Sequence, residues 1–230
     1  VYGPPDFYDP LVGLDVPQQV RAKMDFVGFL QRSVSKDTES EHKQKEDYIL
    51  ITTGGGGDGS DLIHNVIDAY QEDPTLTQRA LIVLGPYMPA KQRHRLLEKG
   101  AKIPYVEVIE FDNRMEELIA GAQGVVGMGG YNTYCEILSF DKPALIVPRV
   151  APREEQLIRA RRASELGLID MLLPDEAADP KRMAEALKTL PSRPAPSASA
   201  AHMQLEGLPH ISQIVGEWLG RRDHLSVVQG

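Results

Sequence analysis

The stretch Gly127–Ala160, GMGGYNTYCEILSFDKPALIVPRVAPREEQLIRA, decides the fold of this chain. It predicts a glycine-rich turn, an amphipathic helix, a short strand ended by Pro148, and a charged loop that opens a second helix. The strand, Ala144–Val147, is continuously apolar, as strands buried on both faces of a parallel sheet are. The glycine turn leaves backbone N–H groups exposed where a helix begins, and the helix dipole favours anions there. The stretch therefore predicts an α/β domain with an anion site at the carboxyl ends of its strands.

Strands and helices alternate on both sides of this stretch. We expect strands over Tyr48–Ile51, Ala80–Leu84, Tyr105–Phe111, Gly124–Gly127, Leu145–Val147 and Ile169–Leu173. Further helices are expected over Asp61–Gln71, Ala90–Lys99, Arg114–Ala122, Glu154–Gly167 and Pro180–Leu190. Strict alternation with short connections implies a parallel sheet with right-handed crossovers and helices on both faces. The predicted fold class is a doubly wound, Rossmann-like α/β domain.

The two ends of the chain have a different composition. Residues 1–46 begin with a stretch rich in Pro, Gly and Asp and end in a polar, charged loop, so we expect an interdomain connection from a missing N-terminal half. The alternative is an enzyme with an irregular N-terminus. The α/β domain is expected over 47–190, a flexible linker rich in Pro, Ser and Ala over 191–207, and a helix and tail over 208–230.

Composition excludes several classes of protein. The hydrophobic fraction of 42% and the charged fraction of 25% in 230 residues are ordinary for a globular protein. A net charge of −8 argues against a general binder of nucleic acid or of anionic membranes. The single cysteine, Cys135, fits a reducing compartment, and no apolar run approaches the roughly 20 residues that span a bilayer. We expect a cytoplasmic protein.

A second glycine-rich loop, TTGGGGDGSD at Thr52–Asp61, follows the first strand of the domain. It lacks the Gly-Lys-Ser/Thr of a Walker motif, and no acidic residue ends the following strand as dinucleotide binding requires. The alternative is a tight structural turn. Paired with the turn at Gly127–Gly130, the loop predicts a cleft with two anion-binding walls, which suits a diphosphate.

These motifs together resemble a known family. The pattern includes E-F-x-x-x-M at Glu110–Met115, G-G-x-x-T-x-x-E at Gly129–Glu136, K-P-A-L-I-V-P at Lys142–Pro148 and E-x-Q at Glu154–Gln156. It is similar to the C-terminal, donor-binding half of GT-B glycosyltransferases, and in particular to family 28, which includes the N-acetylglucosaminyl transferases of the lipid-linked peptidoglycan precursor. The resemblance covers roughly Lys23 to Leu173.

The resemblance implies a binding site for a nucleoside-diphosphate sugar, UDP-linked by expectation. It assigns the ribose hydroxyls to Glu136. The groups expected to face the diphosphate are Gly129, Gly130 and Thr133. The base would be framed by Phe111 and Asp112, and the donor sugar contacted by Glu155 and Gln156. The glycines that leave room for the sugar and acceptor are Gly54, Gly55 and Gly56.

Several residues depart from the family pattern or have a simpler interpretation. Glu155 stands where the family has a glutamine, and a carboxylate only accepts hydrogen bonds, so the donor sugar stays open. Arg149 follows Pro148 where an aromatic residue is common, and either meets a phosphate or lies on the surface. We expect His64 to face solvent. A solvated basic face is expected for Arg159, Arg161 and Arg162.

The sequence indicates no catalytic residue, metal or cofactor. The family's catalytic base commonly comes from the N-terminal half, and no Asp-x-Asp pair is present for Mg²⁺. Three interpretations remain: the donor-binding part of a two-domain transferase, a stand-alone subunit that binds the nucleotide sugar and joins a partner chain, and a nucleotide-sugar epimerase or hydrolase. Any membrane contact would come through the missing half.

Overall fold

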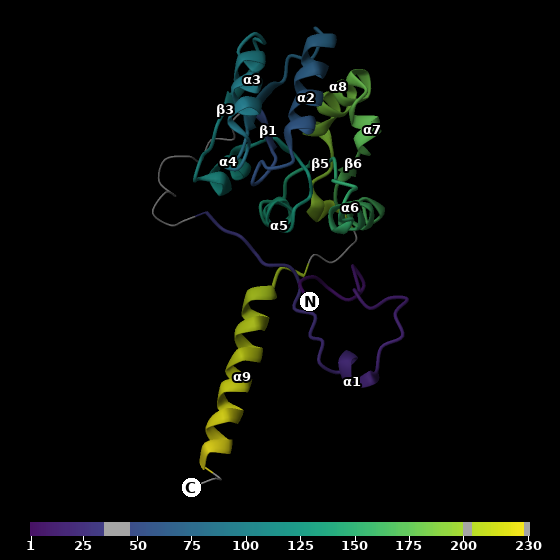
Figure 1. Cartoon of the computed structure of the whole chain (residues 1–230), viewed down its shortest axis with the longest axis vertical. Coiled ribbons are helices and arrows are strands. Elements are labelled where there is room, and N and C mark those ends of the chain that lie inside the picture. Colours follow the sequence, from purple (N-terminus) through teal and green to yellow (C-terminus); the bar gives the residue numbers. More distant parts are fainter. Residues whose placement is uncertain (35–46, 200–203, 228–230) are drawn as a thin grey trace. The chain divides into compact units, whose positions relative to one another are not determined.

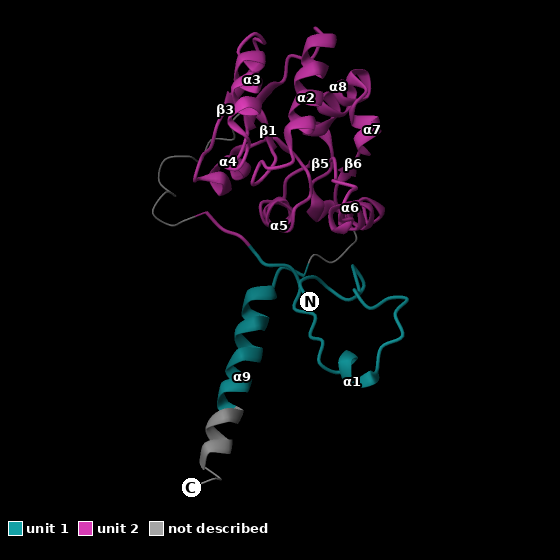
Figure 2. Ribbon diagram, viewed as in Figure 1, with its two compact units in different colours: residues 1–31, 202–230 teal, residues 32–201 magenta. Residues whose placement is uncertain are grey.

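The computed structural model of the chain describes residues 1–34, 47–199 and 204–227. These residues form two compact units, shown in different colours in Figure 2. Residues 32–201 make up the larger unit, called the sheet domain below. The terminal unit combines residues 1–31 with residues 202–230.

The sheet domain is built on a 6-stranded parallel sheet with the order β3-β2-β1-β4-β5-β6. Its strands are β1 (Tyr48–Thr52), β2 (Arg79–Val83), β3 (Val106–Ile109), β4 (Gly124–Gly127), β5 (Ala144–Ile146) and β6 (Asp170–Met171). Strand β1 is buried at every residue because it lies mid-sheet with helices on both faces. The predicted doubly wound fold is confirmed.

Helices cover both faces of this sheet (Figure 1). One face carries α2 (Ser60–Glu72), α3 (Ala90–Gly100), α7 (Pro174–Ala177) and α8 (Pro180–Thr189). The other carries α4 (Met115–Gly121), α5 (Tyr131–Ser139) and α6 (Glu155–Glu165). All of the helices expected in this domain are present, with ends that differ by a few residues.

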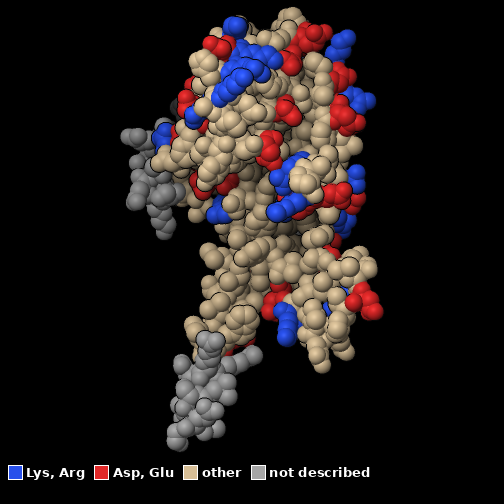
Figure 3. Space-filling view, viewed as in Figure 1, with Lys and Arg blue, Asp and Glu red and all other residues tan. Residues whose placement is uncertain are grey.

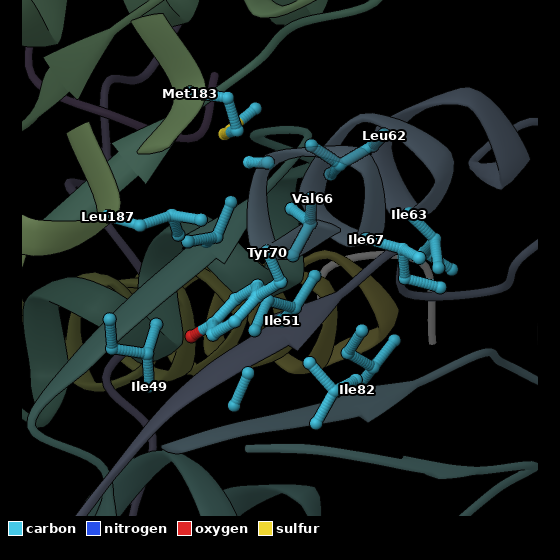
Figure 4. Close-up of a cluster of buried hydrophobic side chains, with 14 of the residues drawn as sticks. Ile49, Ile51, Leu62, Ile63, Val66, Ile67, Tyr70, Ile82, Met183 and Leu187 are labelled. Carbon is cyan, nitrogen blue, oxygen red and sulfur yellow. The ribbon is translucent and has the colours of Figure 1, made fainter. Parts of the chain in front are cut away.

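The core lies between β1, β2 and the helices of the α2 face (Figure 4). Helix α2 buries Ile63, Val66, Ile67 and Tyr70, whose spacing of three or four residues places them on one side of the helix. Leu187 of α8 is fully buried against this side, and each such side chain stabilises the fold by about 1.5–3 kcal/mol. This packing makes α2 a rigid support for the loop that precedes it.

The order of the strands places a switch point between β1 and β4. The chain leaves β1 for β2 and β3, then returns through α4 to β4, on the opposite side of β1. Thr52 at the end of β1 lies opposite Gly127 at the end of β4. In open α/β sheets, ligands bind outside the carboxyl ends of the strands at such a point, because the following loops diverge there.

Part of the segment expected to be a flexible linker, 191–207, is attached to the sheet domain. Leu190 is fully buried, and two 3₁₀ turns follow at Leu190–Ser192 and Pro196–Ala198. Ser197 donates its backbone N–H to Asp141 Oδ1 at 2.8 Å, and Ser199 Oγ donates to Leu166 O at 2.5 Å. Residues 190–199 therefore belong to this domain, whereas 200–203 lie outside the described residues.

The terminal unit pairs the two ends of the chain. Antiparallel bridges join Gly3 to Gly28 and Leu30 to Glu206, and the Phe7 and Phe29 rings meet edge to face at 5.0 Å. The unit contains α1 (Gln18–Arg21) and α9 (Gly207–Val227). Among the helices of the described ranges, none is both long enough and apolar enough to cross a membrane.

Candidate functional site

A cavity of about 280 Å³, called the switch-point cavity below, lies at the carboxyl ends of β1 and β4. The predicted site residues that line it are Gly54, Gly55, Gly56, Gly130, Thr133 and Gln156. The two glycine-rich segments face each other there, since a Cβ on Gly54 would lie 4.0 Å from Thr133 Oγ1. The predicted cleft with two glycine walls is present.

Five predicted site residues do not appear among the described residues that line this cavity. They are Phe111, Asp112, Gly129, Glu136 and Glu155. Gly129 precedes Gly130, the N-cap of α5, and Glu155 forms an ion pair with Arg149. The remaining three follow β3 or lie further along α5.

The turn that opens α5 depends on the backbone of Gly129. Its φ of +74° is in the left-handed region, and a Cβ there would come within 2.9 Å of Ile146 Cγ2. Gly130 is the N-cap of α5, and no side chain caps this end of the helix. The first N–H groups of a helix have no partner within the helix, so this turn offers donors to a ligand in the switch-point cavity.

Arg159 of α6 fixes the orientation of this turn. Its Nη1 donates to the carbonyl of Gly129 at 2.7 Å, and its guanidinium lies 5.6 Å from the centre of the Tyr131 ring. In a trans peptide, C=O and N–H point in opposite directions, so the Gly130 N–H points away from Arg159. Gly130 lines the cavity, so this hydrogen bond fixes a peptide at the edge of the cavity.

The burial of Arg159 overturns one expectation. Desolvation lowers the pKa of this guanidinium, which is partly buried between α5 and α6. The predicted solvated face is thus wrong for Arg159, whereas Arg161 on the same helix is exposed. Nothing local in the sequence shows that the turn before α5 contacts α6, and this contact is what buries the Arg159 side chain.

The glycine loop after β1 is held in place by the turn after β2. Gly56 has a φ of +81°, and a Cβ there would fall 2.3 Å from the carbonyl oxygen of Leu84. The carbonyl of Gly55 accepts a hydrogen bond from the Tyr87 N–H at 2.8 Å. Close backbone packing therefore accounts for part of the glycine run. The same loop is both a tight structural turn and a wall of the switch-point cavity.

Arg149 links this loop to the start of α6. Its Nη1 donates to Asp58 Oδ2 at 2.7 Å and its Nη2 to Glu155 Oε1 at 2.5 Å. Its backbone N–H donates to Gln156 Oε1 at 3.0 Å. The carboxylate of Glu155 is therefore engaged by Arg149, while Gln156 lines the cavity with its amide oxygen already bonded. The Gln156 amide nitrogen is then the group suited to donate to a ligand.

Glu136 lies on a flank of α5 that also carries Asn132 and Ser139. Arg32 Nη2 donates to Asn132 Oδ1 at 2.9 Å, and the Arg32 N–H donates to Ser139 Oγ at 2.9 Å. Burial raises the pKa of the Glu136 carboxyl, Glu116 raises it further, and Arg32 opposes the shift. A partly buried carboxylate with two acceptor oxygens suits a ligand that brings hydroxyl donors.

Phe111 and Asp112 follow β3, two strands from β1 in the sheet. The Phe111 side chain is 56% exposed, which leaves its ring open to a flat ligand. Asp112 Oδ1 accepts the backbone N–H of Arg114 at 2.7 Å, just before α4 begins. This bond lowers the pKa of Asp112, and through it the carboxylate stabilises the turn before α4.

A second cavity of about 490 Å³, called the α2-side cavity below, adjoins the first. Asp58 and Met128 line both cavities. His64 lines the second cavity and is partly buried instead of facing solvent as predicted, and desolvation lowers the pKa of its imidazole. Within the described residues, no group of three or more His, Cys, Asp or Glu side chains could hold a metal ion.

Comparison with known proteins finds similar glycosyltransferases. A curated relative is 21% identical over 145 residues, or 63% of this chain: the UDP-N-acetylglucosamine--N-acetylmuramyl-(pentapeptide) pyrophosphoryl-undecaprenol N-acetylglucosamine transferase of Alkaliphilus metalliredigens (strain QYMF). The match covers 40% of that protein, so the chain spans less than half the length of this relative.

Solved glycosyltransferases share the fold. The calicheamicin glycosyltransferase CalG4 matches 95% of this chain and 51% of its own, with a TM-score of 0.63 and 20% identity. The spinosyn rhamnosyltransferase SpnG complexed with thymidine diphosphate matches 86% of this chain and 50% of its own, with a TM-score of 0.59 and 18% identity. MurG of Acinetobacter baumannii matches 77% of this chain and 51% of its own, with a TM-score of 0.57 and 14% identity.

The family assignment rests on a longer match. Residues 48–214 match the Glycosyltransferase family 28 C-terminal domain, a range that runs from β1 into α9. It includes both glycine-rich walls of the switch-point cavity and the start of α6. The chain therefore belongs to glycosyltransferase family 28, of which it carries the C-terminal domain.

Proposed function

We propose that the sheet domain binds a nucleoside-diphosphate sugar and is the donor half of a glycosyltransferase that moves a hexosyl group to an acceptor hydroxyl. The observation that carries this proposal is the switch-point cavity, which lies between two glycine-rich walls at the uncapped N-terminus of α5. Backbone donors and the helix dipole there would stabilise the diphosphate as it leaves.

The walls of this cavity suggest how each part of the ligand is held. The N–H groups at Gly130 and the hydroxyl of Thr133 would donate to the diphosphate. The glycine loop Gly54–Gly56 would let the ligand approach the backbone closely. Gln156 would donate its amide N–H beyond the diphosphate toward the sugar, and Glu155 would act there through Arg149.

The nucleoside would extend from the cavity along α5 toward the end of β3. Glu136 would accept hydrogen bonds from the ribose hydroxyls, and Phe111 and Asp112 would frame the base. We propose UDP as the nucleotide, because the Alkaliphilus relative is named for a UDP sugar. One SpnG structure contains thymidine diphosphate, so dTDP is the alternative to test.

Transfer needs more than this domain. We propose that the catalytic base and the acceptor site come from an N-terminal domain or from a partner subunit. Acidic and basic side chains are interspersed on the face in Figure 3, which gives no support for a nucleic-acid partner. We place the protein in the cytoplasm, where its single buried cysteine would stay reduced.

Calorimetry with UDP, dTDP, GDP and ADP tests this proposal. One diphosphate should bind with a dissociation constant on the order of 0.1–1 mM, since closure against a second domain cannot contribute. The matching nucleoside without phosphates is the control and should bind far more weakly. If none of the diphosphates binds, or if the nucleoside binds equally well, the donor-site proposal fails.

A further inference from the structure

The α2-side cavity is placed to receive a group attached to the diphosphate. It adjoins the switch-point cavity through Asp58 and Met128, which line both. Its volume of about 490 Å³ falls in the range of small-molecule sites, roughly 300–1,000 Å³. Both cavities are formed by residues of the sheet domain, so a ligand could occupy them together.

The walls of this cavity have the chemistry of a carbohydrate site. Helix α2 presents Asp61, His64 and Asn65, and the last two lie on the side of Asp61 because they follow it by three and four residues. Carboxylate, imidazole and amide groups are suited to the hydroxyls of a sugar. Val147 and Pro148 at the end of β5 also line the cavity and supply apolar surface for the C–H face of a ring.

Of the two residues expected to contact the sugar, Gln156 lines only the switch-point cavity, and Glu155 is engaged elsewhere. Glu155 does not line either cavity, and its carboxylate accepts a hydrogen bond from Arg149 Nη2 at 2.5 Å. Arg149 also binds Asp58, so its charge is balanced at the boundary between the cavities. Within the lining, the charge of Arg149 is offset by Asp58, and the carboxylate of Asp61 adds a negative charge. This charge would disfavour an anionic sugar.

From this arrangement, and resting on the proposed function, we propose that the α2-side cavity binds the hexosyl ring of the donor. Asp61 and Asn65 form hydrogen bonds with the hydroxyls of the sugar, and the cavity prefers neutral hexoses over uronic acids. Desolvation lowers the pKa of His64, so near neutral pH its imidazole is uncharged and offers one donor and one acceptor. The sugar specificity of the enzyme thus resides in the first turns of α2.

Saturation-transfer NMR on the full chain tests this assignment. The ligands are UDP-glucose, dTDP-glucose and UDP-glucuronic acid, with UDP and dTDP as references. The wild-type chain should transfer saturation to the nucleoside and to the glucose ring protons, and less to the glucuronic acid ring. Asn65→Ala and Asp61→Asn should weaken binding of the sugar nucleotide about threefold to tenfold and leave the bare diphosphate unchanged.

The matched control is Glu72→Gln, which changes an exposed carboxylate at the far end of α2. It should leave every ligand unaffected. Equal weakening of sugar nucleotide and bare diphosphate by the α2 variants, or no weakening of either, overturns the sugar site and leaves the donor-site proposal intact. If the wild-type chain binds none of UDP, dTDP, GDP and ADP, both proposals fail.

Discussion

At the scale of single residues, Arg159 donates a hydrogen bond to the carbonyl of Gly129. Arg159→Met should weaken nucleoside-diphosphate binding about tenfold, because the peptide that joins Gly129 to the cavity-lining Gly130 loses its anchor. Binding of the bare nucleoside should not change, since that part of the ligand is assigned to α5 and β3. Calorimetry with both ligands measures the difference.

Arg161→Met is the control for this substitution, because it removes the same charge from an exposed position of α6. It should leave both affinities unchanged. Arg159→Lys should recover part of the lost affinity if the bond to the carbonyl matters. A uniform loss for nucleoside and diphosphate would instead show that Arg159 only supports the fold.

The pKa of Glu136 makes nucleotide binding depend on pH. Burial raises this pKa above the ordinary value of 4.5, so the folded domain keeps the proton to a higher pH than the unfolded chain does. Domain stability therefore falls as pH rises from about 4.5 through the raised pKa. Affinity for the nucleotide should rise over the same interval, because the ionised carboxylate is the better acceptor for the ribose hydroxyls.

Titrations at a series of pH values measure this dependence. Glu136→Gln should flatten both trends while the domain stays folded, since the amide cannot ionise and has nearly the same shape. If the pH dependence of affinity is the same in this variant, the ribose assignment of Glu136 is wrong.

At the scale of elements, two adjacent glycines in the turn that opens α5 have different roles. Gly129 shapes the turn, and Gly130 lines the switch-point cavity. Gly129→Ala should destabilise the domain by about 1–2 kcal/mol or more, because its φ is +74° and its Cβ would meet Ile146. Gly130→Ala should leave the melting temperature nearly unchanged, since its φ is −55° and its Cβ would meet no atom within 4 Å. The added methyl should nevertheless weaken nucleotide binding, because Gly130 lines the cavity.

Thermal melts and calorimetry on the two variants check this contrast. Gly130→Ala that binds the diphosphate normally would show that the ligand does not approach this part of the turn. A stable Gly129→Ala would contradict the packing of the turn against β5.

Local patterns predicted the elements of the sheet domain well, for physical reasons. Strand β1 is apolar at the positions buried by helices on both faces, and Gly100 marks the end of α3. The glycine loops at the strand ends were visible because close backbone packing and a left-handed turn require glycine there.

Local sequence patterns do not predict contacts between distant parts of the chain. Arg149 reaches Asp58 and Arg159 reaches Gly129, and only the fold brings these pairs together. The same limit applies to the segment 191–199, whose composition is that of a linker. Ser197 and Ser199 attach it through Asp141 and Leu166, far away in sequence.

At the scale of the whole molecule, these attachments set the true end of the sheet domain. A chain ending at residue 201 keeps the 3₁₀ turns, the buried Leu190 and both serine hydrogen bonds. It should melt in the same range as the full chain and bind nucleotide equally well, although the terminal unit loses its pairing with Glu206. A chain ending at residue 189 loses all of these contacts.

The shorter chain should be less stable by about 2–5 kcal/mol, mainly because Leu190 leaves a cavity in the core. Urea unfolding of the two truncated chains and the full chain measures this difference, and nucleotide affinity under native conditions is the accompanying readout. Equal stability of the chains ending at 189 and 201 would mean that residues 190–199 lie on the domain without stabilising it. A large loss already at 201 would mean instead that the sheet domain depends on the terminal unit for its fold, so that the two units could not be separated as donor-binding domain and connection.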